Sequence, residues 1–178
     1  MRDIEGIERV VENLKPHWRD IRAHFDAENN RFKALMSRNH DLLGRVLKCH
    51  LIVENYLERF LATHYGIDDI ESVKLSYFQK AKLLPDTGSA AAFVKPGVLE
   101  LNAIRNRFGH TLEANIAPEQ LRAINQVLDV AREGINFETS IERIEAFTTV
   151  ACTFMVIVPP NLQDIFMSAF AGIRVNAL

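Results

Sequence analysis

Apolar residues recur every three or four positions along most of the chain, a pattern that predicts amphipathic helices. The clearest case covers residues 41–65, where Asp41 stands near the start and Gly66 follows the last turn, as a left-handed C-terminal cap requires. The same pattern predicts further helices over residues 4–15, 17–37, 75–84, 98–110, 118–133, 139–158 and 162–175. No alternation of apolar and polar residues indicates a sheet.

Prolines and capping residues set the expected boundaries of these helices. Pro16 separates the first two helices, and Pro85 ends the helix before it. Residues 85–97 are expected to form a loop with one helical turn at most. Thr139 followed by Glu142 is a capping box that opens a helix. The second half of that helix is rich in β-branched residues, so a buried strand is the alternative there.

Helices that each carry one apolar stripe must bury those stripes against one another. We therefore predict an all-α fold, an up-and-down helical bundle with additional N- and C-terminal helices. A length of 178 residues fits a single domain over residues 1–178. Near the C-terminus, aromatic and methionine side chains at helical spacing are expected in the core or in a dimer interface: Phe147, Phe154, Met155, Phe166, Met167 and Phe170.

Composition and charge exclude several classes of protein. With 48% hydrophobic and 25% charged residues, the chain is neither collagen-like nor wholly disordered. A net charge of −2 without a basic tail does not favour strong nonspecific binding to nucleic acid. The uncharged stretch over residues 146–163 is interrupted by threonines and prolines and is too short to cross a bilayer, so we expect no membrane partner.

Cysteine and histidine spacing argues against a disulfide framework and against a metal site. Cys49 and Cys152 lie far apart, and the histidines share no short ligand spacing. We expect no metal and no cofactor. The first residues lack a basic start followed by an apolar segment, so the expected location is the cytoplasm.

The most informative polar residues lie between positions 101 and 110. Asn102, Asn106 and His110 form one row at intervals of four on a helix, Arg105 lies beside Asn106, and Gly109 leaves space on the Arg105 side. A cation and an imidazole without a neighbouring carboxylate favour an anion, most simply a phosphate. Arginine would clamp it through two hydrogen bonds, and histidine would donate or accept a proton.

The run Arg105-Asn106-Arg107-Phe108-Gly109-His110 resembles the motif of HEPN domains (higher eukaryotes and prokaryotes nucleotide-binding). In that family an arginine, usually followed by a polar residue, precedes a histidine by four to six intervening positions; here there are four. A long helix with the run 50–61, a helix over 75–84 and then the motif helix are similar in order to bacterial HEPN-like proteins. The resemblance covers roughly residues 40–135.

This resemblance implies a bundle that forms a homodimer with the two motifs facing each other in one composite site. Many HEPN domains are metal-independent endoribonucleases, often toxins or antiviral effectors, whereas others are inactive dimerisation modules or bind nucleotide or RNA. By this resemblance Arg105 and His110 would be catalytic and Asn106 would support them. His110 would move a proton while a ribose 2′-hydroxyl attacks phosphorus, and Arg105 would stabilise the phosphorane, leaving a 2′,3′-cyclic phosphate. Toxin-like members are commonly paired with a small antitoxin or a nucleotidyltransferase.

Several residues allow both a functional and a structural interpretation. His50 and Glu54 either join Asn102 in a substrate pocket, or form a core histidine and a solvated carboxylate. Arg107 either contacts RNA or covers the bundle surface. The cluster from Arg105 to His110 could itself be a network at a helix end that fixes packing or a dimer. Four lysines flank the loop before the motif and either receive phosphates or form a solvated face: Lys74, Lys80, Lys82 and Lys95.

Three functions are considered for the chain on these grounds. The leading one is a HEPN-type endoribonuclease, and the alternative is an inactive HEPN-like dimerisation or nucleotide- or RNA-binding regulatory module. A helical DNA-binding repressor ranks last, because no helix-turn-helix with a basic recognition helix is present in the sequence.

Overall fold

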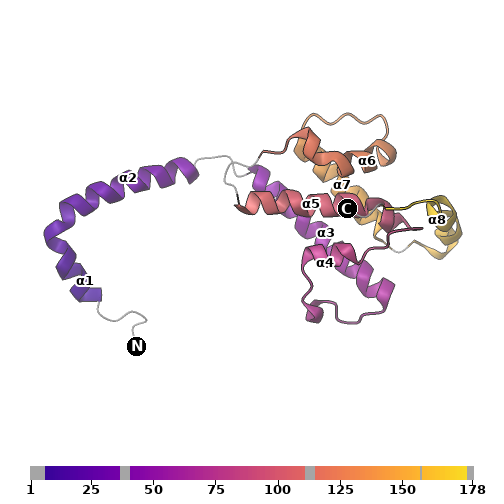
Figure 1. The fold of residues 1–178 in the computed structure, drawn as a ribbon, viewed down its shortest axis with the longest axis horizontal. Coiled ribbons are helices and arrows are strands. Elements are labelled where there is room, and N and C mark those ends of the chain that lie inside the picture. The colour runs from indigo at the N-terminus through magenta and orange to yellow at the C-terminus, as the bar shows by residue number, and fades with distance from the viewer. Residues whose placement is uncertain (1–6, 37–40, 111–114, 157, 176–178) are drawn as a thin grey trace. The chain divides into compact units, whose positions relative to one another are not determined.

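The computed structural model describes residues 7–36, 41–110, 115–156 and 158–175, without the side chains of residues 7, 8, 35, 71 and 110 (Figure 1). The described residues are mainly helical and contain no strand, only an isolated bridge between Thr87 and Arg174. The predicted all-α class is confirmed. The chain divides into two compact units, Met1–Asn39 and His40–Leu178. One domain over residues 1–178 stays a prediction.

The first unit consists of helix α1 (Ile7–Leu14), the 3-10 turn η1 (Lys15–His17) and helix α2 (Trp18–Met36). Pro16 lies inside η1. Proline lacks the N–H that a continuous α-helix needs, so the α-helix is interrupted at this turn. The predicted break at Pro16 is thus a change of helix type. No described side chain of this unit is buried.

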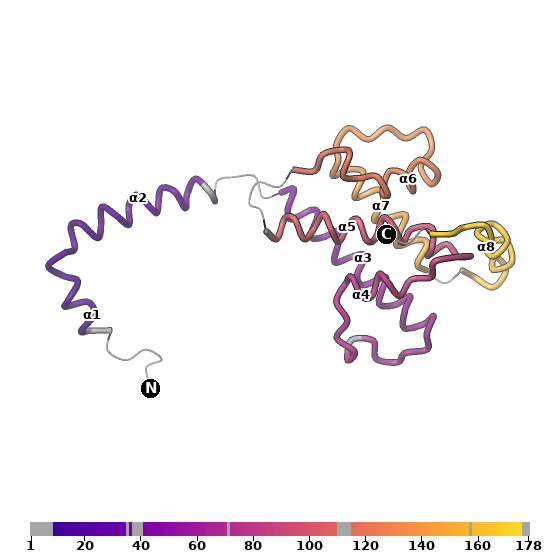
Figure 2. The backbone as a smooth tube through the Cα atoms, in the orientation of Figure 1, coloured from indigo at the N-terminus to yellow at the C-terminus, as the bar shows by residue number. Residues whose placement is uncertain are grey.

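The second unit is a helical bundle, as predicted. Its helices are α3 (Asp41–Tyr65), α4 (Tyr77–Lys82), α5 (Ala90–His110), α6 (Arg122–Ala131), α7 (Ser140–Phe154) and α8 (Gln163–Phe170). Short 3-10 turns cover Glu71–Val73, Pro118–Leu121 and Pro160–Leu162. Helix α5 contacts α3, α4, α6, α7 and α8, and Figure 2 shows it between α6 and α4. It is the central helix of the bundle.

The predicted loop over residues 85–97 is wrong in its second half, because α5 begins at Ala90. Ser89 Oγ accepts a hydrogen bond from the backbone N–H of Ala92 at 3.1 Å, which satisfies one of the free donors at the helix start. Three successive alanines then favour the helix. Pro96 lies inside α5 and removes a single donor, so it does not end the helix.

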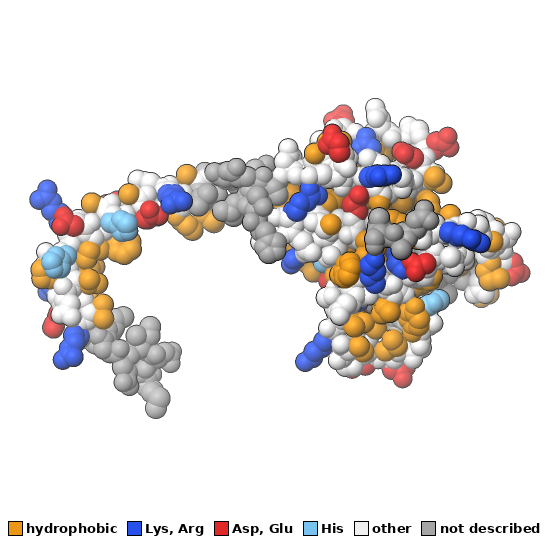
Figure 3. Space-filling model, viewed as in Figure 1, with side chains coloured by type: hydrophobic (Ala, Val, Ile, Leu, Met, Phe, Trp, Pro, Cys, Tyr) orange, Lys and Arg blue, Asp and Glu red, His pale blue; other side chains and the backbone are white. Residues whose placement is uncertain are grey.

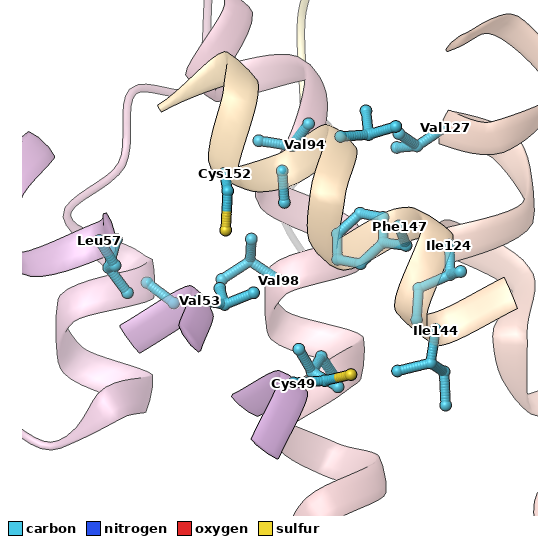
Figure 4. Packing of buried hydrophobic residues seen from close by; sticks show 14 of the residues in the cluster. Cys49, Val53, Leu57, Val94, Val98, Ile124, Val127, Ile144, Phe147 and Cys152 are labelled. Carbon is cyan, nitrogen blue, oxygen red and sulfur yellow. The ribbon is translucent and has the colours of Figure 1, made fainter. Parts of the chain in front are cut away.

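The core is built mainly from α3, α5, α6 and α7 (Figure 4). Val53, Leu101, Ile124 and Phe147 are fully buried within it. Helices α5 and α7 approach closely at Gly97, because a Cβ at this position would overlap the Phe147 ring. Only glycine therefore allows the two helices to pack this closely.

The core contains both cysteines of the chain. Cys49 and Cys152 are free and buried, and burial raises the pKa of Cys152 to about 11, so the thiol stays protonated at neutral pH.

The capping box at Thr139 is confirmed, with Thr139 Oγ1 accepting from the Glu142 N–H at 3.3 Å. Gly66, at φ 66°, is also confirmed in the left-handed conformation after α3.

The C-terminal segment differs from the prediction, since α8 ends at Phe170 instead of continuing to Val175. The chain then pairs with the loop before α5, where the Val175 N–H donates to the Asp86 carbonyl at 2.8 Å. Of the residues expected in the core or an interface, Phe147 and Met155 are buried, whereas Met167 is exposed. No helix in the described part of the chain is long and apolar enough to cross a membrane.

The close approach at Gly97 makes a prediction about stability. Gly97→Ala should lower the free energy of unfolding by about 1–3 kcal/mol, because the new methyl group overpacks the Phe147 ring. Gly44→Ala is the matched control, since a Cβ there meets nothing within 4 Å in an exposed helical position, and it should stabilise by up to about 1 kcal/mol. Urea denaturation measures both. Equal effects of the two substitutions would contradict the packing described.

Candidate functional site

The motif predicted from the sequence lies on the last two turns of α5. The helix continues through His110, so Gly109 does not end it. Asn102, Asn106 and position 110 are therefore spaced by one helical turn each, as expected. The side chain of His110 lies outside the described residues.

Arg105 carries an exposed guanidinium without an acidic partner among the described residues. Its Nη1 donates to Asn106 Oδ1 at 3.3 Å, so the predicted Arg105–Asn106 pair is brought together. A Cβ added at Gly109 would lie 3.9 Å from Arg105 Nη1, which places Gly109 beside the guanidinium, as expected. Arg107 is exposed as well. The end of α5 thus offers cationic donors to an anion.

His50 on α3 and Asn102 on α5 meet behind this surface. His50 is 6% exposed, its Nε2 lies 3.4 Å from Asn102 Oδ1, and its ring stacks on Tyr77 with centroids 3.9 Å apart. A carboxamide oxygen only accepts, so Nε2 carries the proton, and Nδ1 is then the bare nitrogen. Nδ1 is buried and has no hydrogen-bond partner in the described part of the chain.

Burial is the main reason why the pKa of His50 lies below its ordinary value, and the positive charge of Arg105 adds to the effect. The hydrogen bond with Asn102 and the charge of Glu54 oppose it, without reversing the shift. His50 is therefore neutral at physiological pH. It fixes the amide of Asn102 and is too enclosed to contact a large substrate.

Glu54 pairs with a lysine of α4, while its charge also acts on the His50 ring. A shared role of His50 and Glu54 in a substrate pocket stays a prediction. The Glu54 carboxylate accepts from Lys80 Nζ at 2.8 Å, and Glu58 accepts from the same ammonium group at 2.5 Å. Burial lowers the pKa of Lys80, but the bonds to Glu54 and Glu58 outweigh burial and raise it overall. The other interpretation expected a solvated Glu54 carboxylate. This expectation is wrong, because three quarters of the Glu54 side chain is covered.

Two of the four lysines considered for phosphate binding are buried and already paired. Lys80 binds the two glutamates, and Lys95 Nζ donates to Asp86 and to the carbonyls of Lys82 and Leu84 at 2.6–2.9 Å. Lys95 therefore fixes the turn before α5. Lys82 and Lys74 are exposed and fit the solvated face.

Sequence reasoning did not predict that Tyr77 and Lys80 are buried. Phe78 is 50% exposed, whereas Tyr77, Lys80, Ala81 and Leu84 are buried. These four positions also follow helical spacing. The lysine in that row is the signal that could have revealed the buried ion pairs.

The arrangement is suited to binding an anion. Lys80 binds the carboxylates of Glu54 and Glu58, so both are already paired within the bundle. Among the described residues, no group of three or more histidine, cysteine, aspartate or glutamate side chains is placed to hold a metal ion. Comparison with models of protein families, with curated proteins and with solved structures finds no match to this chain.

The lowered pKa of His50 predicts a pH dependence of stability. Between the folded pKa and the ordinary value of 6.5, the unfolded chain binds more protons than the folded one. The free energy of unfolding should therefore fall as pH drops through this range. His50→Gln should remove that part of the dependence, and His64→Gln, at an exposed position of the same helix, should leave it intact. Urea denaturation at neutral and mildly acidic pH measures the free energy of unfolding of each variant. Identical pH profiles for the parent and His50→Gln would contradict the assignment of this pH dependence to His50.

Proposed function

We propose that this protein is a metal-independent endoribonuclease of the HEPN type. One observation carries the proposal: Arg105 presents an exposed guanidinium without an acidic partner in the described part of the chain, five positions before His110 on the same continuous helix. Asn106 holds the guanidinium through Nη1, and Gly109 has no side chain to cover the same nitrogen. A phosphodiester fits this combination of charge and space.

The proposed chemistry needs only these side chains. Arg105 binds the phosphate oxygens and stabilises the negative charge that develops on the phosphorane. His110 accepts the proton of the 2′-hydroxyl as this oxygen forms a bond to the adjacent phosphorus, and a proton is returned to the 5′-oxygen of the next nucleotide as the P–O5′ bond breaks. The products are a 2′,3′-cyclic phosphate and a 5′-hydroxyl end. Asn106 positions Arg105, Asn102 is held by the buried His50, and Arg107 contacts the RNA backbone.

We place the active form in a homodimer with two facing motifs. The exposed face of α3 supports this, because Leu43, Leu47 and Leu51 stand in one row and are 38–56% exposed. A hollow of about 440 Å³ lies along the same helix. Burying such an apolar row is a common reason for self-association. A toxin or defence role in the cytoplasm, with a neutralising antitoxin or nucleotidyltransferase, belongs to the same proposal.

A second candidate function is an inactive dimerisation or RNA-binding module. The engagement of Asn102 with His50 and of Asn106 with Arg105 favours it, because both amides already have partners inside the chain. In this case RNA or nucleotide would bind without being cut.

Substitutions in the motif separate the two functions. His110→Ala and Arg105→Ala should each slow RNA cleavage roughly 100-fold to 10,000-fold, because proton transfer or charge stabilisation is lost. Arg132→Ala removes an exposed arginine next to α6 and should leave the rate unchanged. Cleavage rates on total RNA measure this, with circular dichroism as a check of folding. If the parent cuts and His110→Ala cuts equally fast, the assigned site is wrong; binding without cleavage by the parent favours the second function.

A further inference from the structure

The first unit carries a regular row of apolar residues. From Ile7 to Leu35 the row advances by four and three residues in alternation, and eight of its nine positions are apolar. The positions are Ile7, Val11, Leu14, Trp18, Ile21, Phe25, Glu28, Phe32 and Leu35. A strict 3.5-residue repeat of this kind is the heptad pattern of a coiled coil, and Glu28 is its one polar position.

Most of the described side chains in this row, which we call the seam, are exposed. Trp18, Phe25 and Phe32 are 49–64% exposed, and Val11 and Leu14 are exposed as well. Figure 3 shows hydrophobic side chains along α1 and α2. Isolated helices are marginal in water, and a continuous apolar row on a surface marks an interaction site. The helical arm, residues 7–36, therefore needs a partner.

The period of the seam indicates that the partner is a helix. A straight α-helix drifts by about 20° per heptad relative to a seven-residue repeat, so a strict heptad seam stays in contact only with a helix that supercoils around it. A flat lipid surface does not supply such a path. The charge of the arm also argues against an anionic membrane, because residues 7–36 carry six basic and five acidic side chains.

We propose that the partner is the same arm of a second copy, paired as a coiled coil. The partner must offer a seam of equal length and period, whereas the exposed apolar row of α3, Leu43, Leu47 and Leu51, is shorter and advances by four residues at each step. Two arms, each with three half-exposed aromatic rings and several aliphatic side chains, offer on the order of 1,000 Å² to bury, which reaches the range of specific interfaces. The η1 turn with Pro16 separates α1 from α2, so the seam consists of two α-helical segments, and the longer one begins at Trp18 on α2.

This pairing goes beyond the proposed ribonuclease and does not depend on it. It would hold two bundles at a high effective concentration, whatever the bundles do. Its test must therefore report on the arms alone, because a dimer formed by the bundles would give the same mass.

Trp18 provides such a report, because it is the single tryptophan of the chain and lies on the seam. On the full-length protein, we expect its emission to shift to the blue and its acrylamide quenching to fall as protein concentration rises. Phe25→Glu should move the midpoint of this change to a concentration more than roughly tenfold higher, because a charge enters the seam. Ala23→Glu adds the same charge on the outward side and should behave as the parent. Glu28→Leu completes the seam and should move the midpoint to lower concentration.

Three results would overturn the proposal. The first is a Trp18 signal that does not depend on protein concentration, which would mean a monomeric arm or an arm docked within its own chain. The second is an equal response of Phe25→Glu and Ala23→Glu. The third is a blue shift that occurs only with vesicles containing phosphatidylserine, which would identify a lipid surface as the partner.

Discussion

The contact between Gly97 and Phe147 is the constraint on which the bundle depends. Because α5 has no side chain at this point, the Phe147 ring of α7 can lie against its backbone. Helix α5 can then occupy the centre and contact five other helices. The same helix carries Arg105, Asn106 and His110 at its C-terminal end. The packing of the core thus determines where the polar residues of the candidate site emerge.

The positively charged side chains of the bundle differ in whether they are already paired or free to bind a ligand. Lys80 and Lys95 are buried and neutralised by carboxylates and carbonyls, which leaves them structural. Arg105 and Arg107 remain exposed at the end of α5. His50 is kept neutral by burial and serves to hold Asn102 in place. The result is a surface with exposed positive charge and a fixed polar layer beneath it.

Much of the fold could be predicted from local patterns. The helix over residues 41–65, its glycine cap and the capping box at Thr139 are set by residues close in sequence, and all are confirmed. The start of α5 could not be predicted in this way. Proline and glycine at 96–97 are typical of a loop, and the sequence alone does not show that the Phe147 ring fills the space beside them. The pairing of Lys80 with Glu54 was missed for a similar reason, since it depends on contacts between α3 and α4. Arg105 and Asn106 are neighbours in the sequence, so their contact needs no tertiary packing.

The central claim is that the chain cuts RNA through its own side chains. The most direct measurement incubates the purified, folded protein with total RNA in excess EDTA and determines the chemistry of the new ends. The account predicts new 5′-hydroxyl ends and 2′,3′-cyclic phosphates, since the 2′-hydroxyl is the nucleophile and no metal takes part. Intact RNA, or new ends with a 3′-hydroxyl and a 5′-phosphate, would contradict it.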